Sequence, residues 1–129
     1  MMGFTRYWEF ERLDSEKFKD FSNICQLLID NVDIPLEDIV VNETQVRFNG
    51  VDDDGHETFN FYLNKDGFNF CKTATKPYDE VACGCLYIAK LIFGDSIRIN
   101  QDCLPEEDEP YVKKVISILR ENKLNQLLK

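Results

Sequence analysis

The chain has little of the chemistry from which metal sites and secreted domains are built. Its 129 residues contain a single histidine, His56, and five cysteines, an odd number. Cys83 and Cys85 form one close pair, but no second pair or histidine cluster completes a zinc tetrahedron. We therefore expect no metal and no other cofactor. Free thiols that fall mostly within apolar patterns suit a reducing compartment, so we expect a cytoplasmic protein.

Positive charge and long apolar runs are also scarce. Fifteen lysines and arginines are outnumbered by 24 aspartates and glutamates, which gives a formal net charge of −9. Nucleic-acid backbones and anionic membranes both attract a concentrated positive surface, so we expect neither general nucleic-acid binding nor membrane docking. No apolar run approaches the ~20 residues of a membrane span. The opening residues also lack the apolar core of a signal peptide.

The composition that is present, 43% hydrophobic and 30% charged, predicts one globular domain over residues 1–129. Turns at Asp54-Gly55 and Asn64–Gly67 predict that three middle strands form a meander. Hairpins with segregated helices predict an α+β fold, in which a mainly antiparallel sheet packs with three helices. The expected order, β-α-β-β-β-α-β-α, is a strand in 4–12, a helix in 14–32, three strands in 44–73, a helix in 77–94, a strand in 97–100 and a helix in 106–124.

A small basic segment interrupts the acidic chain. Residues 65–76 carry three lysines and one aspartate, a net +2. Lys72, Thr73, Thr75 and Lys76 lie in a loop before a helix that we expect to begin at Pro77. Free N–H groups at a helix start favour an anion, and the hydroxyl groups add donors. The loop therefore predicts a phosphate or carboxylate pocket; an ordinary solvated loop is the alternative.

A second polar cluster lies in the predicted turn at residues 52–57. Asp53, Asp54, His56 and Glu57 offer a base and metal ligands for a small hydrolase, although a polar hairpin turn explains them equally well. Strand alternation places Glu57 on the core side, and the register of a meander places Phe68 and Phe70 on that side too, with Lys72 diagonal to Glu57. We therefore expect a Glu57–Lys72 ion pair, which is either structural or orients the lysine toward a ligand.

Aromatic and basic residues on the predicted strands extend the candidate binding set. Trp8 is a core residue or a ligand platform, while an exposed Tyr7 or Arg6 would stack on a planar ring. Arg47 and Arg98 lie on polar strand faces, where each either grips an anion or is a surface charge. The full set of candidate ligand-binding residues is Tyr7, Trp8, Arg47, His56, Glu57, Lys72, Thr73, Thr75, Lys76 and Tyr78.

Two blocks of sequence resemble an uncharacterised family of small bacterial and phage proteins. Residues 48–59 match the pattern F-N-G-x-x-D-D-G-H-E-T-F, and residues 70–79 match F-C-K-T-x-x-K-P-Y-D. The opening Gly3-Phe4-Thr5-x-Tyr7-Trp8 is also similar to the start of that family. The family has no established activity, so the resemblance implies no catalytic residue. It does imply that the two blocks form one site.

Three functions follow from these patterns. The first is a non-enzymatic binding module for a small anionic, phosphorylated or nucleotide-like ligand. In the phage setting that the resemblance implies, such a module would sequester an immune signal in the host cytoplasm. The second is the small hydrolase. The third is a protein-interaction module or inhibitor, with a protein partner or a second copy of the chain. Its acidic residues 1–43, with four basic and ten acidic side chains, would meet a basic surface.

Overall fold

The computed structural model describes residues 4–122 and 124, so Gly3 of the opening block lies outside the described residues. Three short 3-10 helices join the larger elements, at Asp52–Asp54, Gly94–Ser96 and Pro105–Asp108. The strands and α-helices are, in order, β1 (Thr5–Phe10), α1 (Ser15–Asp30), β2 (Leu36–Asn42), β3 (Gln45–Gly50), β4 (Phe59–Tyr62), β5 (Gly67–Lys72), α2 (Asp79–Phe93), β6 (Ile97–Gln101) and α3 (Glu109–Glu121).

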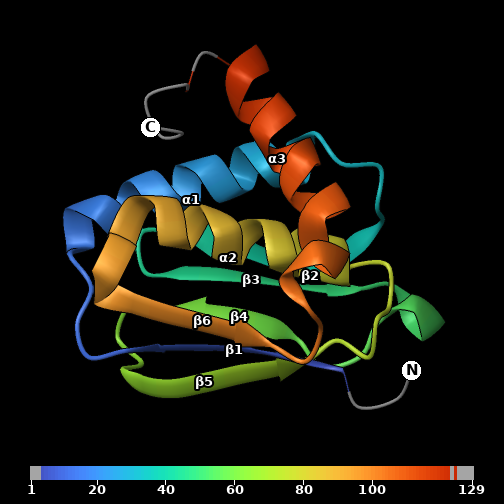
Figure 1. The fold of residues 1–129 in the computed structure, drawn as a ribbon, viewed down its shortest axis with the longest axis horizontal. Coiled ribbons are helices and arrows are strands. Elements are labelled where there is room, and N and C mark those ends of the chain that lie inside the picture. The colour runs from blue at the N-terminus through green and yellow to red at the C-terminus, as the bar shows by residue number, and fades with distance from the viewer. Residues whose placement is uncertain (1–3, 123, 125–129) are drawn as a thin grey trace.

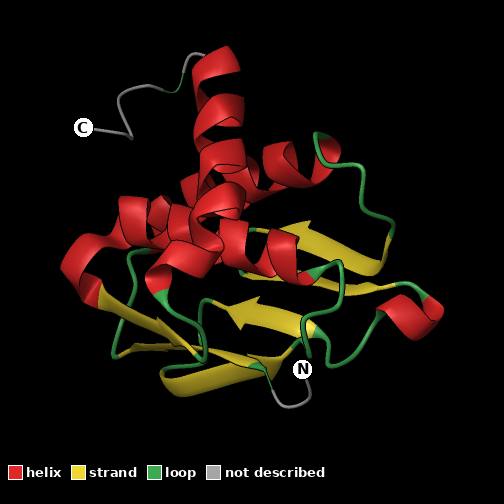
Figure 2. Cartoon of the chain, turned by 45° about the vertical axis from the view of Figure 1, so that its right-hand side comes forward, coloured by secondary structure: helices red, strands yellow, loops and turns green. Residues whose placement is uncertain are grey.

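The strands form two small antiparallel sheets, which confirms the α+β class. Sheet A has the order β5-β1-β6, and sheet B has the order β2-β3-β4. Helices α1 and α2 lie together on one side of the strands, and α3 crosses them at an angle (Figure 1). When the molecule is turned by 45° about the vertical axis, the helices still lie above the strands of both sheets (Figure 2).

The predicted three-stranded meander is wrong in two respects. Strands β3 and β4 do form a hairpin, but β5 leaves them and pairs with β1, so that Phe70 lies opposite Tyr7. The third strand of sheet B is β2, which we did not predict. Its sequence hides it, because the pairing of β2 with β3 shifts register between Glu37 and Val40 and breaks the alternation.

The helices form where the apolar spacing places them. Asp14 caps α1 by accepting hydrogen bonds from the N–H groups of Glu16 and Lys17 at 2.8 and 3.0 Å. Helix α2 begins at Asp79, and Pro77 lies in the turn before it and not in its first turn. Most of α2 is buried, because α1 and α3 both pack against it. This makes α2 the central helix of the three.

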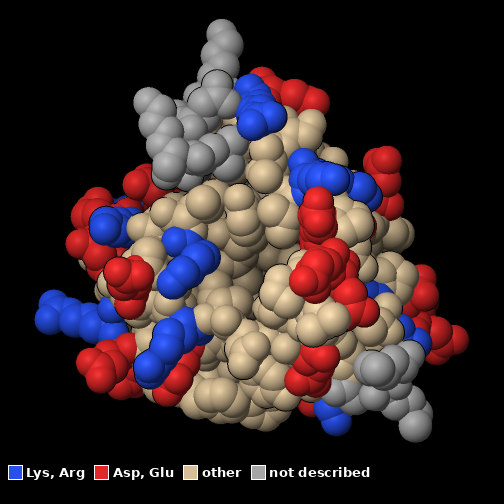
Figure 3. Space-filling view, viewed as in Figure 1, with Lys and Arg blue, Asp and Glu red and all other residues tan. Residues whose placement is uncertain are grey.

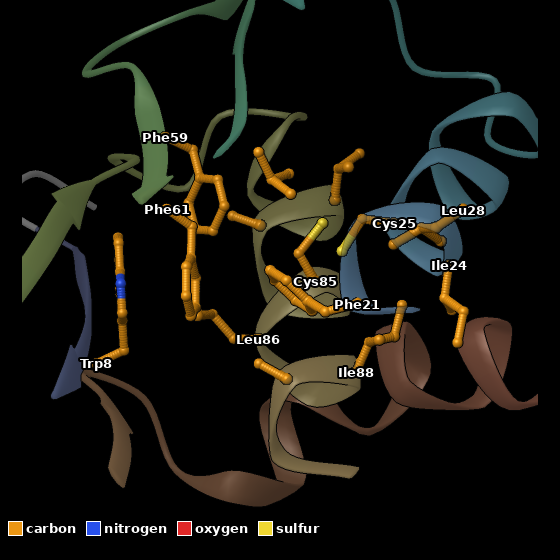
Figure 4. Close-up of a cluster of buried hydrophobic side chains, with 14 of the residues drawn as sticks. Trp8, Phe21, Ile24, Cys25, Leu28, Phe59, Phe61, Cys85, Leu86 and Ile88 are labelled. Atoms are coloured by element: carbon orange, nitrogen blue, oxygen red, sulfur yellow. The ribbon is translucent and has the colours of Figure 1, made fainter. Parts of the chain in front are cut away.

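The core is centred on the ring of Phe61 in β4. Trp8 stacks on it with ring centroids 5.6 Å apart, and Phe21 of α1 lies 4.8 Å away on the same measure. Figure 4 shows Trp8 and Phe61 side by side, with the side chains of α1 and α2 gathered beyond them. Sheet A, sheet B and α1 therefore meet at one residue. Trp8, which is 2% exposed, is a core residue and not a surface platform.

All five cysteines are free thiols, and four of them are buried. Burial raises the pKa of Cys71 and of Cys83 to about 12, so both are protonated at neutral pH. Cys71 donates to the carbonyl oxygen of Glu57 at 3.4 Å. Within the described part of the chain, no helix is long and apolar enough to cross a membrane.

Candidate functional site

The predicted anion loop is built from internal hydrogen bonds. The Thr73 side chain is buried, and its hydroxyl donates to Asp79 Oδ1 at 2.6 Å. The hydroxyl of Thr75 donates to the carbonyl of Ala74 at 2.6 Å. The main-chain N–H of Lys76 donates to the carbonyl of Thr73 at 3.0 Å. These donors therefore hold the loop in shape and are not presented to a ligand.

The start of α2 already carries a negative charge of its own. Asp79 is the first residue of the helix and is buried, and Glu80 follows it. A helix N-terminus attracts an anion because of its unpaired N–H groups and its dipole, but here a side chain of the protein supplies that anion. The basic segment is also dispersed: Lys65 lies before β5 and Lys72 at its far end, roughly 20 Å away at ~3.4 Å per residue.

Arg6 forms the most buried ionic cluster of the described structure. Its side chain is 2% exposed and points to the same side of β1 as Trp8. Nε and Nη2 donate to the two carboxylate oxygens of Asp79 at 2.7 and 2.8 Å. Nη1 and Nη2 donate to the two oxygens of Asp108 at 2.8 Å each. Arg6 thus joins β1 to the start of α2 and to the segment before α3, and it cannot stack on a ligand as we had expected.

The charges in this cluster stabilise one another. Burial disfavours the guanidinium, but its hydrogen bonds to Asp108 and Asp79 outweigh burial and raise the pKa of Arg6. Burial acts in the opposite direction on Asp108, where the hydrogen bond from Arg6 prevails and lowers the pKa of the carboxyl group. One cation between two carboxylates holds three elements together, so we assign this cluster a structural role.

The aspartate-rich turn is also explained by its backbone. Asp52–Asp54 form a 3-10 turn, and the side chain of Asn49 bonds both the N–H and the carbonyl of His56, at 3.1 and 3.0 Å. Gly50 and Gly55 approach so closely that a Cβ on Gly50 would lie 2.2 Å from the Asp54 carbonyl oxygen. Glycine is therefore required for the turn to close.

As candidate hydrolase residues, Asp53, Asp54 and His56 all have exposed side chains. A group of three or more acidic, histidine or cysteine side chains placed to hold a metal ion is absent from the described residues. The turn therefore offers exposed carboxylates around a closed backbone and does not enclose a reaction centre.

The two motif blocks do lie together, but through main-chain bonds. The N–H of Lys72 donates to Glu57 Oε1 at 2.7 Å, and the N–H of Glu57 donates to the Lys72 carbonyl at 3.2 Å. The buried Tyr78 hydroxyl donates to the carbonyl of Glu57 at 2.5 Å. Glu57 is therefore bound to the backbone of Lys72 and not to its ammonium group, which corrects the expected ion pair. Tyr78 serves the same junction and is closed to a ligand.

The outer side of sheet A carries an exposed aromatic surface that the sequence interpretation placed in the core. Phe68 and Phe70 of β5 are 59% and 58% exposed, whereas Asn69 and Cys71 between and after them are buried. Tyr7 of β1 lies on the same side, with its ring centroid 5.7 Å from that of Phe68. The rings of Phe68 and Phe70 are 6.1 Å apart. We call these three residues the aromatic face.

A cavity of about 630 Å³ lies at one end of the aromatic face. Tyr7 and Phe68 line it together with Glu9, Arg98 and Asn100 from the same side of the sheet, and Lys90 of α2 also lines it. Arg98 and Glu9 form an exposed ion pair at 3.3 Å. The Asn100 Oδ1 accepts from the N–H of Gln101 at 2.9 Å, so the amide NH₂ of Asn100 points away from the Gln101 N–H. The cavity thus combines ring surfaces, a guanidinium and an amide donor.

Charge on this side of sheet A differs from that of the whole protein. Lys72 and Arg98 are balanced by Glu9 alone, a net +1 in a chain of net −9. On the face that Figure 3 shows, by contrast, acidic and basic side chains are interspersed around an uncharged centre. Among the described residues, the ammonium group of Lys72 makes no hydrogen bond or ion pair. It is therefore available to an anion that lies over the aromatic face.

The outer side of sheet B has no comparable surface. Arg47 donates from Nε to the Asp38 carbonyl at 3.1 Å, so it is engaged in the sheet and not free to grip an anion. Asn60 donates to the Tyr62 hydroxyl at 2.9 Å and accepts from Gln45 at 3.1 Å. The polar side chains on the outer side of sheet B therefore form hydrogen bonds with one another. Acidic residues of β2 lie at the edge of this sheet, where charge and a bulge discourage pairing with another strand.

Of the sequence-predicted site residues, the structure leaves Tyr7, Lys72 and Arg98 beside a ligand-accessible surface. It adds Phe68, Phe70 and Asn100 to them. One sequence signal points to this group, because Phe68, Phe70 and Lys72 alternate along one strand and share a side. We had used that alternation to place the phenylalanines inside, and a free lysine on the same side argues for the reverse.

Comparison of the chain with family models, curated proteins and solved structures gives no match. The resemblance to the small bacterial and phage family therefore stays a prediction. The fold and the aromatic face define the class of protein on their own: a small α+β domain with a cavity lined by aromatic side chains on one sheet.

Proposed function

We propose that this protein is a non-enzymatic binding module for a small nucleotide-like anion, which it holds on the outer side of sheet A. The observation that carries the proposal is the cavity between Tyr7, Phe68, Asn100 and Arg98. Aromatic side chains on a sheet stack on bases, and a base stacked in this way contributes about 1–3 kcal/mol. Asn100 can donate to the edge of such a ring, and Arg98 can bind a phosphate in two-pronged geometry.

The acidic character of the protein supports a small ligand and not a nucleic-acid strand. A strand would bring its phosphates across a surface of net −9, whereas a small anion meets only the local net +1. Arg98 is paired with Glu9, but both side chains are exposed, at 81% and 44%. Exposed pairs contribute only about 0.2–1 kcal/mol, so an incoming anion can replace the Glu9 carboxylate.

The size of the aromatic face also favours a small ligand over a protein partner. Phe68 and Phe70 expose roughly 200 Å² together, taking ~150–250 Å² for a whole aromatic side chain. A stable protein interface needs about 800 Å² from each partner. The aromatic face is therefore large enough for one or two bases and small for a permanent interface.

The test is calorimetry with three probes that separate the ring from the charge. Adenosine 5′-monophosphate has both, adenosine has only the ring, and ribose 5-phosphate has only the anion. We expect the nucleotide to bind at least tenfold more tightly than either half, because the cavity contacts both parts. Phe68→Ser should reduce the affinity at least tenfold, while Tyr62→Ser, a matched aromatic change on the outer side of sheet B, should leave it unchanged.

Failure of every nucleotide-like anion to bind would refute the proposal. The panel therefore also includes ADP-ribose isomers and cyclic dinucleotides, because sequestration of a host immune signal by a phage protein in the cytoplasm is the finer form of the proposal. That finer form rests on the family resemblance. Binding that is equal in the wild type and in Phe68→Ser would place the ligand elsewhere. Capture of a protein through Phe68 and Phe70, with no nucleotide effect, would favour the interaction module.

A further inference from the structure

The cavity accounts for only part of the aromatic face. It is lined by Tyr7 and Phe68 and served by Arg98, but neither Phe70 nor Lys72 lines it. Phe70 nevertheless continues the row of rings directly, at 6.1 Å from Phe68. It is 58% exposed, although apolar side chains of this size are mostly buried. The aromatic face therefore has a further aromatic group, Phe70, and a further cation, Lys72, beside it and outside the cavity.

The two cations lie at opposite corners of the row. Lys72 is opposite Thr5 at one end of the paired region of β5 and β1, and Arg98 is opposite Glu9 toward the other end, on β6. Four residues along a strand and two strand spacings separate them, which is about 16 Å between backbones. Both side chains are long enough to reach toward the rings between them. Each end of the row thus has its own positive group.

We infer that the ligand is a dinucleotide, with two bases and two phosphodiester groups. This inference rests on the proposed function and names the ligand class of the same site. One base occupies the cavity against Tyr7 and Phe68, and the second lies on Phe70. A phosphodiester carries a single negative charge, so two of them match Arg98 and Lys72 one to one. A terminal phosphate carries up to two charges. It matches the cavity less well, because Lys90, the second cation that lines it, already donates to the carbonyls of Gly94 and Ile97, which leaves Arg98 beside Glu9.

The backbone of Lys72 is fixed in a way that suits this role. Its N–H and carbonyl groups are both bonded to Glu57, at 2.7 and 3.2 Å, so the free edge of β5 is tied down at this residue. The side chain projects from an anchored backbone on the same side as Phe70. Glu57 is therefore a positioning residue for the second cation, through the main chain and not through an ion pair.

The test compares two probes that carry the same base and the same type of phosphate. Adenosine 3′,5′-cyclic monophosphate has one base and one phosphodiester, and cyclic di-adenosine monophosphate has two of each. We expect the cyclic dinucleotide to bind at least tenfold more tightly in calorimetry. Phe70→Ser and Lys72→Gln should reduce the affinity for the dinucleotide several-fold more than that for the mononucleotide. Phe68→Ser and Arg98→Gln should weaken both probes.

The outcomes separate this inference from the proposed function. Equal affinity for the two probes would overturn the two-base ligand and leave the binding module intact. Equal loss for both probes in Phe70→Ser would also overturn it, because Phe70 would then belong to a one-base site. If neither probe nor any other nucleotide-like anion binds, the proposed function itself fails. Trp8 fluorescence in urea confirms that each variant is folded, since all four substitutions are at side chains outside the core.

Discussion

Sheets A and B distribute their side chains in opposite ways. Sheet B buries Val46, Phe48, Phe59 and Phe61 and turns hydrogen-bonded polar groups to solvent. Sheet A buries an arginine with its two carboxylates and turns phenylalanines to solvent. Sheet B follows the rule that apolar groups leave water and charges stay in it. Sheet A departs from this rule on both sides. On its inner side, the buried Arg6 joins β1 to α2 and to the segment before α3. On its outer side, we interpret the exposed rings as a surface for a ligand.

The largest test of this comparison removes the buried cation. We expect Arg6→Met to lower the free energy of unfolding by about 3–5 kcal/mol, because two buried carboxylates lose their partner. The matched change on sheet B is Arg47→Met, which removes one hydrogen bond from a partly exposed side chain and should cost less than about 1.5 kcal/mol. Urea unfolding monitored through Trp8 measures both. Equal losses would show that Arg6 is not a special element of sheet A.

The second test uses pH. The pKa of Asp108 is lowered in the folded protein because the Arg6 hydrogen bond prevails over burial. A carboxyl group of this kind contributes stability above its unfolded pKa, which is close to 3.8, and that contribution disappears as the pH falls through the lower folded value. Asp108→Asn should therefore cost about 1.5–3 kcal/mol at pH 7, the range for a hydrogen bond to a charged group.

The difference in stability between the wild type and Asp108→Asn should shrink as the pH is lowered from 5 toward 2. Urea titrations at a series of pH values give this difference directly. A gap that is constant over the whole range would mean that the Asp108 charge does not contribute to stability. The other carboxylate of the cluster, Asp79 of α2, remains as an internal reference in both proteins.

A smaller effect should follow from freeing the second arginine of sheet A. Glu9→Gln removes the carboxylate that pairs with Arg98 at 3.3 Å and also removes a negative charge from the cavity. We expect the affinity for a nucleotide-like anion to rise about two- to fivefold, in line with the ~0.2–1 kcal/mol of an exposed ion pair. Calorimetry at low and physiological salt measures this, and the gain should decrease as salt screens the charges. A lower affinity would show that Glu9 contacts the ligand itself.

The smallest effect concerns the stability of the exposed rings. Phe70→Ser should change the free energy of unfolding by less than about 0.5 kcal/mol, because surface substitutions away from buried features have effects of that size. Tyr62→Ser on sheet B, where the side chain is 37% exposed, is the matched control. Thermal unfolding of both variants gives the comparison. A loss of 2 kcal/mol or more in Phe70→Ser would mean that this ring stabilises the fold, and its exposure would then give no support to a ligand site.

Local patterns predicted the elements that depend on neighbouring residues. Alternation in residues 4–12 predicted β1, Asp14 predicted the start of α1, and the apolar stripe predicted α2. The helix expected in 106–124 forms over Glu109–Glu121, directly after the 3-10 helix at Pro105–Asp108. In each case the signal and the structure lie within a few residues of each other, so no tertiary information is needed.

The elements that failed depend on distant partners. The turn at Asn64–Gly67 predicts a β4–β5 hairpin, but β1 competes for the same strand, and nothing local to β5 reports that competition. Once β5 joins β1, the buried amide of Asn69 finds the carbonyls of Lys65 and Gly67, and the phenylalanines turn outward. Alternation gave the two sides of β5 correctly and could not say which side faces the core.

The site was predicted only in part, again because its contacts join residues that are distant in the sequence. The two motif blocks do meet, but Glu57 binds the backbone of Lys72, a contact that side-chain chemistry alone does not suggest. Arg6 was within reach of a sequence argument, because it alternates with Phe4 and Trp8 on one strand. The assumption that charges stay outside outweighed that pattern, and the two carboxylates that make burial possible lie 73 and 102 residues away.

The position of β1 has a consequence for how the chain is made. Residues 5–10 are synthesised before both of their partner strands, yet they form the middle strand of sheet A, between β5 and β6. Neither neighbour exists until synthesis has passed residues 72 and 101, and the Arg6–Asp108 bond waits for longer still. Pairings so distant in sequence form slowly. Sheet B and α1 can assemble on the emerging chain, whereas sheet A closes only after β6 has been synthesised, more than 90 residues later than β1.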